Sequence, residues 1–181
     1  MKKTLITAAI LAASCAAPAA FADTDTGTLT INGVIEGTTC HFVSGAQTAQ
    51  INMHKIGTDS LKDLTPGQAY DGYENKTSTS FQIQCPEGVD APKLKFLGEQ
   101  FAVTGDENVT VNSNEATKSV GYALLINNHR IDTNGNTPIA DAPSADGKYT
   151  FDIAARYARA TTDEVVGGDV KSVVTFTVVA D

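Results

Sequence analysis

The sequence predicts an all-β protein built as a sandwich of two sheets. Short runs in which apolar and polar residues alternate at a period of two recur along the chain, which is the spacing of half-buried β-strands. Gly, Pro and Asn stand between these runs, as turns require. No stretch of useful length repeats its apolar residues every 3.6 positions, so we expect at most a short helical turn near residues 60–64.

The chain opens with the features of a secretory signal. Lys2 and Lys3 precede a short apolar run, and Ala20-Phe21-Ala22 matches an A-x-A cleavage site. The run is too short to span a membrane as a helix, which takes about 20 residues. A lipoprotein signal acylated at Cys15 is the alternative, although alanine rather than the usual leucine stands three residues before that cysteine. We predict that residues 1–22 are a removable signal peptide.

Removal of this segment makes the chain more acidic. Two lysines and no acids leave, so the formal charge moves from −8 to −10. Such a charge disfavours nucleic acid and anionic membrane surfaces as partners, and the sequence has no basic cluster with interleaved aromatic residues. The remaining length suffices for one domain with a hydrophobic core.

The segment that follows the signal, residues 23–38, contains the first predicted strand. Gly33 interrupts its apolar face, and a strand interior tolerates glycine best where another backbone or a wall comes close. The segment precedes Cys40, so it can lie outside the covalently closed body of the domain. We therefore expect this strand to complete the sheet of a neighbouring molecule; an ordinary first strand packed in its own domain is the alternative. The apolar face consists of Leu29, Ile31, Gly33 and Ile35.

Two cysteines, Cys40 and Cys85, remain after the signal is removed. In an exported protein they most simply form one disulfide. Closing a loop of this length stabilises the fold by about 4 kcal/mol on the chain-entropy model. A catalytic thiol or half of a metal site has little support, because neither cysteine belongs to a C-x-x-C pair.

Further strands are expected along the rest of the chain. Pro66-Gly67 and Asn134-Gly135 predict turns, and residues 140–147 read as a loop. The expected strands are the pair Ile51 and Met53 and the regions 81–85, 94–96, 103–111 (broken by Gly105-Asp106), 121–126, 149–157 and 170–179.

The last strand is the second feature on which the functional interpretation depends. Its outer edge has no following strand in the printed chain, and natural proteins normally cover an open apolar edge. We expect the strand of another subunit to cover it. The residues that share its apolar face are Gly168, Val170, Ser172, Val174, Phe176, Val178 and Ala180.

These features, in this order, resemble those of the chaperone–usher pilins, in particular the major subunits of type 1-like and F17-like fimbriae. The resemblance rests on the alternating extension with Gly33 seven residues before Cys40, the Cys40…Cys85 pair, the GYALLI strand of residues 121–126, the A-R-Y segment at residues 155–157 and Gly168 fourteenth from the end. It covers the whole chain after the signal. The chain departs from the family in carrying Ala180 where an aromatic residue usually stands next to last.

The resemblance implies an incomplete immunoglobulin-like β-sandwich completed by a donor strand from a neighbouring subunit, a mode of strand addition known for pilins. It implies three segments: the signal peptide 1–22, a donor-strand extension 23–38 and a pilin domain 39–181. The implied donor residues are Leu29, Ile31, Gly33 and Ile35, and the implied acceptor groove is the apolar face of the last strand. The implied partners are a periplasmic chaperone, an outer-membrane usher and neighbouring pilin subunits, in a fimbrium exported through the periplasm to the cell surface.

The resemblance implies a structural subunit that polymerises by donor-strand exchange into the pilus shaft and supports cell adhesion. Two other functions stay open at this point. A minor or tip subunit could bind a host-cell receptor directly, although the chain is too short to hold a separate lectin domain. A periplasmic enzyme or binding protein on a β-sandwich is the other, but no nucleophile elbow, P-loop or dinucleotide motif occurs. His41, His54 and His129 are scattered without the spacing of paired ligands, so we expect no catalytic residues, no metal site and no cofactor.

Overall fold

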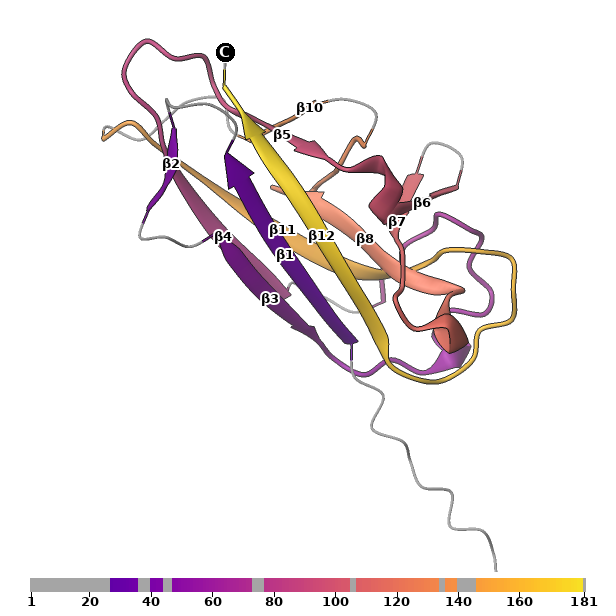
Figure 1. Cartoon of the computed structure of the whole chain (residues 1–181). Coiled ribbons are helices and arrows are strands. Elements are labelled where there is room, and N and C mark those ends of the chain that lie inside the picture. The colour runs from indigo at the N-terminus through magenta and orange to yellow at the C-terminus, as the bar shows by residue number, and fades with distance from the viewer. Residues whose placement is uncertain are drawn as a thin grey trace, which may run out of the picture.

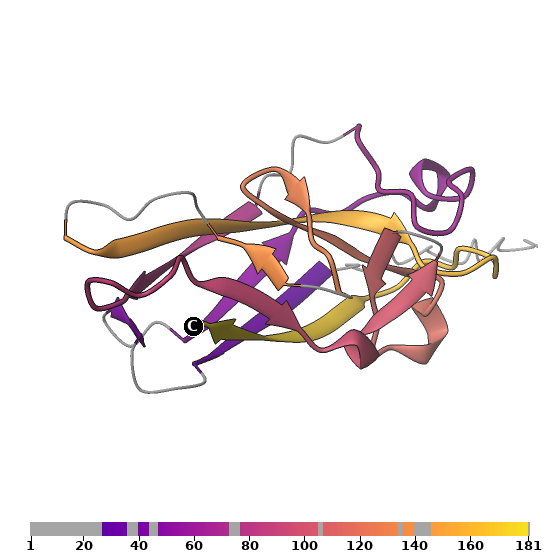
Figure 2. The same cartoon turned by 90° about the horizontal axis from the view of Figure 1, so that it is seen from above.

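In the computed structural model, two five-stranded sheets pack face to face as a β-sandwich of the immunoglobulin-like kind (Figures 1 and 2). The structure describes residues 27–35, 40–43, 47–72, 77–104, 107–133, 136–139 and 146–180. Helical structure within these ranges consists of short 3-10 turns, among them Thr58–Ser60, Gly98–Gln100 and Glu115–Thr117. The all-β prediction is confirmed.

The first sheet, here called sheet A, contains both the first and the last strand of the described chain. Its central strand, β12, runs antiparallel to β5 on one side and parallel to β1 on the other. In spatial order sheet A consists of β10 (Asn136–Pro138), β5 (Lys93–Phe96), β12 (Val170–Val179), β1 (Gly27–Ile35) and β3 (Thr48–Met53).

The second sheet, sheet B, is antiparallel throughout. Its long central strand β11 pairs with β4 on one side and with β8 on the other. In order it consists of β2 (His41–Phe42), β4 (Thr77–Gln84), β11 (Lys148–Arg159), β8 (Val120–Ile126) and β9 (His129–Arg130), and a separate hairpin joins β6 (Phe101–Thr104) to β7 (Glu107–Thr110).

The core lies between the two sheets and is centred on an aromatic cluster. Phe176 of β12 meets four other phenylalanines, with its ring centroid 5.2 Å from that of Phe81 and 6.1 Å from that of Phe42. Edge-to-face pairs of this kind add to the hydrophobic stabilisation of a core. The alternation of buried and exposed residues along β12 follows from the period of two in its sequence.

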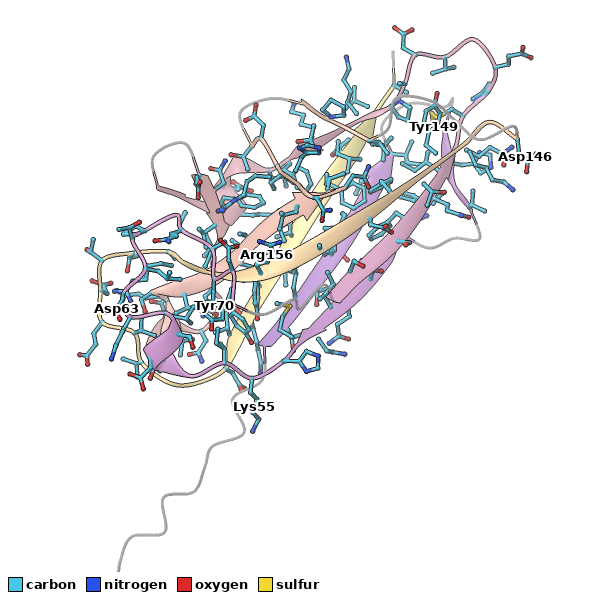
Figure 3. All side chains as sticks on the ribbon, turned by 180° about the vertical axis from the view of Figure 1, so that it is seen from behind. Lys55, Asp63, Tyr70, Asp146, Tyr149 and Arg156 are labelled. Carbon is cyan, nitrogen blue, oxygen red and sulfur yellow. A yellow bond between two sulfur atoms is a disulfide. The ribbon has the colours of Figure 1, made fainter. Side chains whose placement is uncertain are left out.

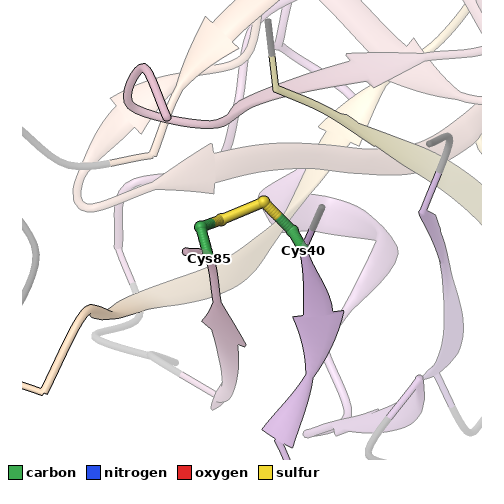
Figure 4. Close-up of a disulfide and its surroundings, with 2 residues drawn as sticks. All are labelled: Cys40 and Cys85. Atoms are coloured by element: carbon green, nitrogen blue, oxygen red, sulfur yellow. A yellow bond between two sulfur atoms is a disulfide. The ribbon is translucent and has the colours of Figure 1, made fainter. Parts of the chain in front are cut away.

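The predicted disulfide between Cys40 and Cys85 is present (Figure 4). It joins the residue before β2 to the residue after β4, with the two Cα atoms 4.2 Å apart. Since β2 and β4 are paired neighbours in sheet B, the bond fixes the edge of that sheet.

The expected strands are found, and the helical turn is found close to its predicted position at Thr58–Ser60. The short strands β2, β9 and β10 escaped prediction because two or three residues show no periodicity. The predicted signal 1–22 lies outside the described residues, as do residues 23–26 and 36–38 of the predicted extension, the Asn134-Gly135 turn and most of the loop 140–147.

Candidate strand-acceptor groove

The candidate site is the slot in sheet A between β12 and β3, which β1 of the same chain fills. All nine residues of β1 pair with β12, from Gly27 opposite Val170 to Ile35 opposite Val178. The strand pairs antiparallel with β3 along its first six residues. Figure 1 shows β1 and β12 side by side and pointing the same way. The last strand is therefore not an open edge in this structure, in contrast to the expectation from the sequence, because the chain's own first strand covers it.

The predicted donor residues and the predicted groove residues lie together in this slot. Leu29 and Ile31 have no exposed surface, Gly33 is buried, and Ile35 is half-buried at the end of the strand. Burial of each such aliphatic side chain contributes about 1.5–3 kcal/mol. On β12 the residues that face the core are buried, namely Val170, Ser172, Val174, Phe176 and Val178; Ala180, just past the strand, is half-buried. Gly168 precedes the strand with a φ of +149°, a value that side chains disfavour.

Gly33 passes a point where the groove has no room for a side chain. A Cβ atom at this position would lie 2.4 Å from Cζ of Phe42 and 2.8 Å from Cζ of Phe176. Both rings belong to the central aromatic cluster and are held by their neighbours. We call this point the Phe constriction; it supplies the physical reason for a glycine in the middle of the apolar face.

Gly27 passes a second constriction, which the sequence analysis missed. A Cβ atom there would lie 2.1 Å from Oη of Tyr157, 2.7 Å from Cβ of Met53 and 2.8 Å from Oη of Tyr122. We call this point the Tyr constriction. The feature of the sequence that could have indicated this role of Gly27 is its position on the same face of the strand as Gly33.

Tyr122 ties the two sheets together beside the Tyr constriction. Its Oη in sheet B donates a hydrogen bond of 2.7 Å to the carbonyl oxygen of Val170 in sheet A. Burial raises the pKa of the Tyr122 hydroxyl far above its ordinary value, and the neighbouring Tyr157 raises it further. The hydroxyl therefore stays protonated and keeps donating at the start of β12.

A single polar position interrupts the apolar face of β12, and its hydrogen bond is satisfied. Oγ of Ser172 accepts a 2.9 Å hydrogen bond from Oγ1 of Thr110, which itself accepts one of 2.8 Å from the backbone N–H of Tyr122. Since buried polar groups are tolerated when they are paired, Ser172 does not weaken the groove.

An apolar hollow extends the groove beyond the start of β12. It lies next to Gly167 and Gly168 and is lined in part by Ile56, Leu61 and Val165. In this structure no residue of β1 reaches it, because β1 begins opposite Val170.

Comparison with known proteins decides the family. No family model matches the chain. The chain is 32% identical to the "Uncharacterized fimbrial-like protein YehD" of Escherichia coli (strain K12), and the alignment covers all of both proteins. The chain belongs to the chaperone–usher fimbrial subunit family. The family predicted from the extension, the cysteine pair and the C-terminal strand is thereby confirmed.

Elsewhere on this fimbrial subunit, the charged residues lie mainly at the surface. Arg156 lies on β11, on the face of sheet B seen in Figure 3, and its Nη1 is 2.5 Å from Oδ1 of Asp71. The described part of the chain contains no cluster of three or more His, Cys, Asp or Glu residues that could hold a metal ion. The same part of the chain contains no helix long and apolar enough to cross a membrane.

Proposed function

We propose that this fimbrial subunit is the repeating structural protein of a fimbrial shaft and that it polymerises by donor-strand exchange. The observation that carries the proposal is the fit of β1 in the slot between β12 and β3. Its apolar residues are buried and its two glycines pass the two constrictions.

Exchange between copies follows from this fit. Every copy has the same groove, so a strand that fills its own groove also fills that of an identical neighbour. The two contact surfaces differ, because one copy supplies the strand β1 and the other supplies the groove between β12 and β3. Such a contact is head-to-tail, so it can repeat from copy to copy without closing into a ring. Repetition produces a linear fibre.

An empty groove would be unstable, which explains the partners that the family implies. Without β1, the backbone groups of β12 and β3 that face the slot lose their hydrogen-bond partners, and the apolar floor of the groove meets water. A periplasmic chaperone would cover the groove. At the outer-membrane usher, the extension of the next subunit would then replace the chaperone in the groove. The signal peptide 1–22 and the division into residues 23–38 and 39–181 belong to the same proposal, as does display at the cell surface.

The role of such a subunit is structural and adhesive, without catalysis. The alternative, a minor or tip subunit that binds a host-cell receptor directly, differs in where the chain lies along the fibre. Immunogold labelling of native fibres separates the two: label along the whole fibre supports the shaft, and label at one end only contradicts it. Purified fibres should contain this chain as their main component.

Donor-strand exchange itself is tested by a charge in the buried face of β1. Ile31→Asp should abolish fibres in electron micrographs, because a carboxylate cannot be buried unpaired in this groove. The matched control is Val34→Asp on the outer face of the same strand, where the side chain is exposed and fibres should persist. Normal fibres from the Ile31→Asp variant would contradict the donor-strand assignment.

A further inference from the structure

A second hollow lies on the outer face of sheet B, away from the groove that β1 fills. It encloses about 200 Å³. Two arginines line it, Arg130 of β9 and Arg156 of β11, and the latter is labelled in Figure 3. They lie on either side of β8, because they pair with Leu125 and Ala123 of that strand. We call this site the arginine hollow.

Arg130 holds the walls of the arginine hollow together. Its Nη1 is 3.1 Å from Oε2 of Glu107, at the start of β7. Its Nη2 donates hydrogen bonds of 2.8 Å to the carbonyl oxygen of Asn108 and of 3.1 Å to that of Gly67. The backbone N–H of Gly67 in turn donates to the carbonyl oxygen of Arg159 on β11. The chain itself therefore keeps the walls in place, so little ordering is needed when a ligand binds.

The rim of the arginine hollow offers both donors and acceptors. Nη1 of Arg156 pairs with Asp71, and its Nε and Nη2 form no hydrogen bond within the described part of the chain. The side-chain oxygen of Gln68 accepts from Thr65, while its amide N–H groups have no partner among the described residues. The carboxylates of Asp71 and Glu107 are exposed, and each can accept several hydrogen bonds.

The balance of charges in the arginine hollow disfavours ions as ligands. An anion would meet two carboxylates in a chain whose formal charge is already −8, and a cation would meet two guanidinium groups. A hydroxyl group both donates and accepts, so a neutral molecule with several neighbouring hydroxyls suits both kinds of rim group. The apolar part of the lining, Ala69, Ala123 and Leu125, suits the C–H groups of a sugar ring.

We propose that the arginine hollow binds one unit of a neutral sugar, with the ring against the apolar lining and the hydroxyls at Arg156, Gln68 and Asp71. Pockets for drug-sized ligands enclose about 300–1,000 Å³, so this smaller hollow fits a single sugar ring. So small a ligand should bind with a dissociation constant on the order of 1 mM.

Repetition of the subunit would make this weak site effective. If copies repeat along a fibre as proposed above, many hollows bind a sugar-coated surface at once, and the avidity can exceed the affinity of one site by about 10²–10⁴. The hollow belongs to sheet B and β1 to sheet A, so a strand in the groove does not cover it. This step rests on the proposed function, whereas binding by the isolated subunit does not.

Titration of the isolated subunit tests the site. The ¹⁵N-labelled protein is titrated with the methyl glycosides of glucose, galactose, mannose and N-acetylglucosamine, and with methyl glucuronide as an anionic probe. We expect at least one neutral probe to shift the NMR signals of the backbone amides of Ala69, Ala123 and Leu125. Arg156→Ala should weaken this binding about tenfold or more, because it removes charged donors.

The matched control is Lys118→Ala, which removes an exposed ion pair with Asp163 outside the hollow and should leave binding unchanged. Asp71→Ala, at an exposed position on the rim, provides a second variant should Arg156→Ala fail to fold, and it too should weaken binding. Unchanged binding by the folded rim variants would overturn the inference. So would the lack of a response to every neutral probe, or a stronger response to methyl glucuronide than to any of them.

Fibres provide the second readout. Fibres of Arg156→Ala should assemble normally, because Arg156 lies outside the groove, and should lose their retention on a surface that carries the sugar bound in the titration. Equal retention of natural and Arg156→Ala fibres would overturn the role of the hollow in adhesion. Absence of fibres from the natural chain would contradict the proposed function and leave the result of the titration standing.

Discussion

Gly33 lies where two aromatic rings of the core leave no space for a side chain, so any substitution there should lower the stability of the subunit. In Gly33→Ala the new Cβ atom meets Phe42 and Phe176, which cannot withdraw without disturbing the aromatic cluster. We expect the free energy of unfolding of the isolated subunit to fall by about 1–3 kcal/mol, the usual cost of overpacking a core. Urea unfolding followed by circular dichroism measures it.

The matched control is Gly57, where an added Cβ atom would meet no other group within 4 Å and where φ is −73°. Gly57→Ala should leave the stability unchanged or raise it by about 0.4–1 kcal/mol, because alanine restricts the unfolded chain. Equal unfolding midpoints for the two variants would contradict the Phe constriction.

Because of Tyr122, we expect the free energy of unfolding to depend on pH in the alkaline range. Its pKa is raised in the folded state, because burial disfavours the charged phenolate, while in the unfolded state it is about 10. Below that pH both states hold the proton and the contribution of Tyr122 is constant. Above it only the unfolded state releases the proton, so the free energy of unfolding falls by up to about 1.4 kcal/mol per pH unit.

Comparison with Tyr122→Phe isolates this contribution. The variant should be less stable at pH 8 by about 0.5–1.5 kcal/mol, since it loses the hydrogen bond to Val170. Its stability should then fall less steeply than that of the natural chain between pH 10 and 11. Parallel curves of urea midpoint against pH would show that Tyr122 is not the group responsible.

At the scale of the elements, the longer strands were predictable from the sequence and their pairing partners were not. Val170–Val179 and Val120–Ile126 alternate or cluster their apolar residues strongly enough to be assigned from sequence. The alternation in Gly27–Ile35 predicts a strand with one buried face, but the same alternation suits a groove in its own chain and in a neighbour's. Its place between β12 and β3 depends on long-range pairing that local periodicity does not contain.

The candidate groove was also predictable only in part: its apolar face could be predicted from the sequence, and its two constrictions could not. The sequence indicates which residues of β12 share a face, because that follows from a period of two. It does not indicate the two constrictions, which arise where Phe42, Tyr122 and Tyr157 arrive from sheet B. Gly27 was missed for this reason: its importance comes from side chains that are distant in the sequence.

Removal of β1 tests its importance as an element. In the described part of sheet A, β3 pairs only with β1, so a chain that lacks residues 23–35 loses the ladder that holds β3 and exposes one edge of β12. We expect this chain to lose its cooperative unfolding transition or to aggregate, as size-exclusion chromatography and circular dichroism would show.

A synthetic peptide of residues 23–37 should restore the transition of the deleted chain, and the same peptide with Ile31→Asp should not. A deleted chain that unfolds at the same urea concentration as the complete one would mean that sheet A is complete without β1. That result would contradict the groove and the functions proposed from it.

At the scale of the whole molecule, the proposed polymerisation requires β1 to leave the groove of its own chain. The strand is connected to Cys40 through only the four residues 36–39, so its own groove is always close. A short tether of this kind corresponds to an effective concentration in the millimolar range. At micromolar protein, rebinding to its own groove is therefore favoured over capture by a neighbour, and the isolated subunit should remain monomeric.

Release of β1 should control how fast isolated subunits polymerise. Because β1 is a central strand that pairs on both sides, its release requires much of sheet A to open, and such opening has the temperature dependence of unfolding. Loss of monomer, followed by size-exclusion chromatography, should accelerate by about 3–6-fold for each 10 °C. Ile31→Asp, whose strand cannot be buried in any groove, should yield no fibres at any temperature. Rapid fibre growth from the natural chain at 4 °C would mean that β1 leaves its groove without this barrier. It would also mean that subunits exchange strands whether or not a chaperone is present.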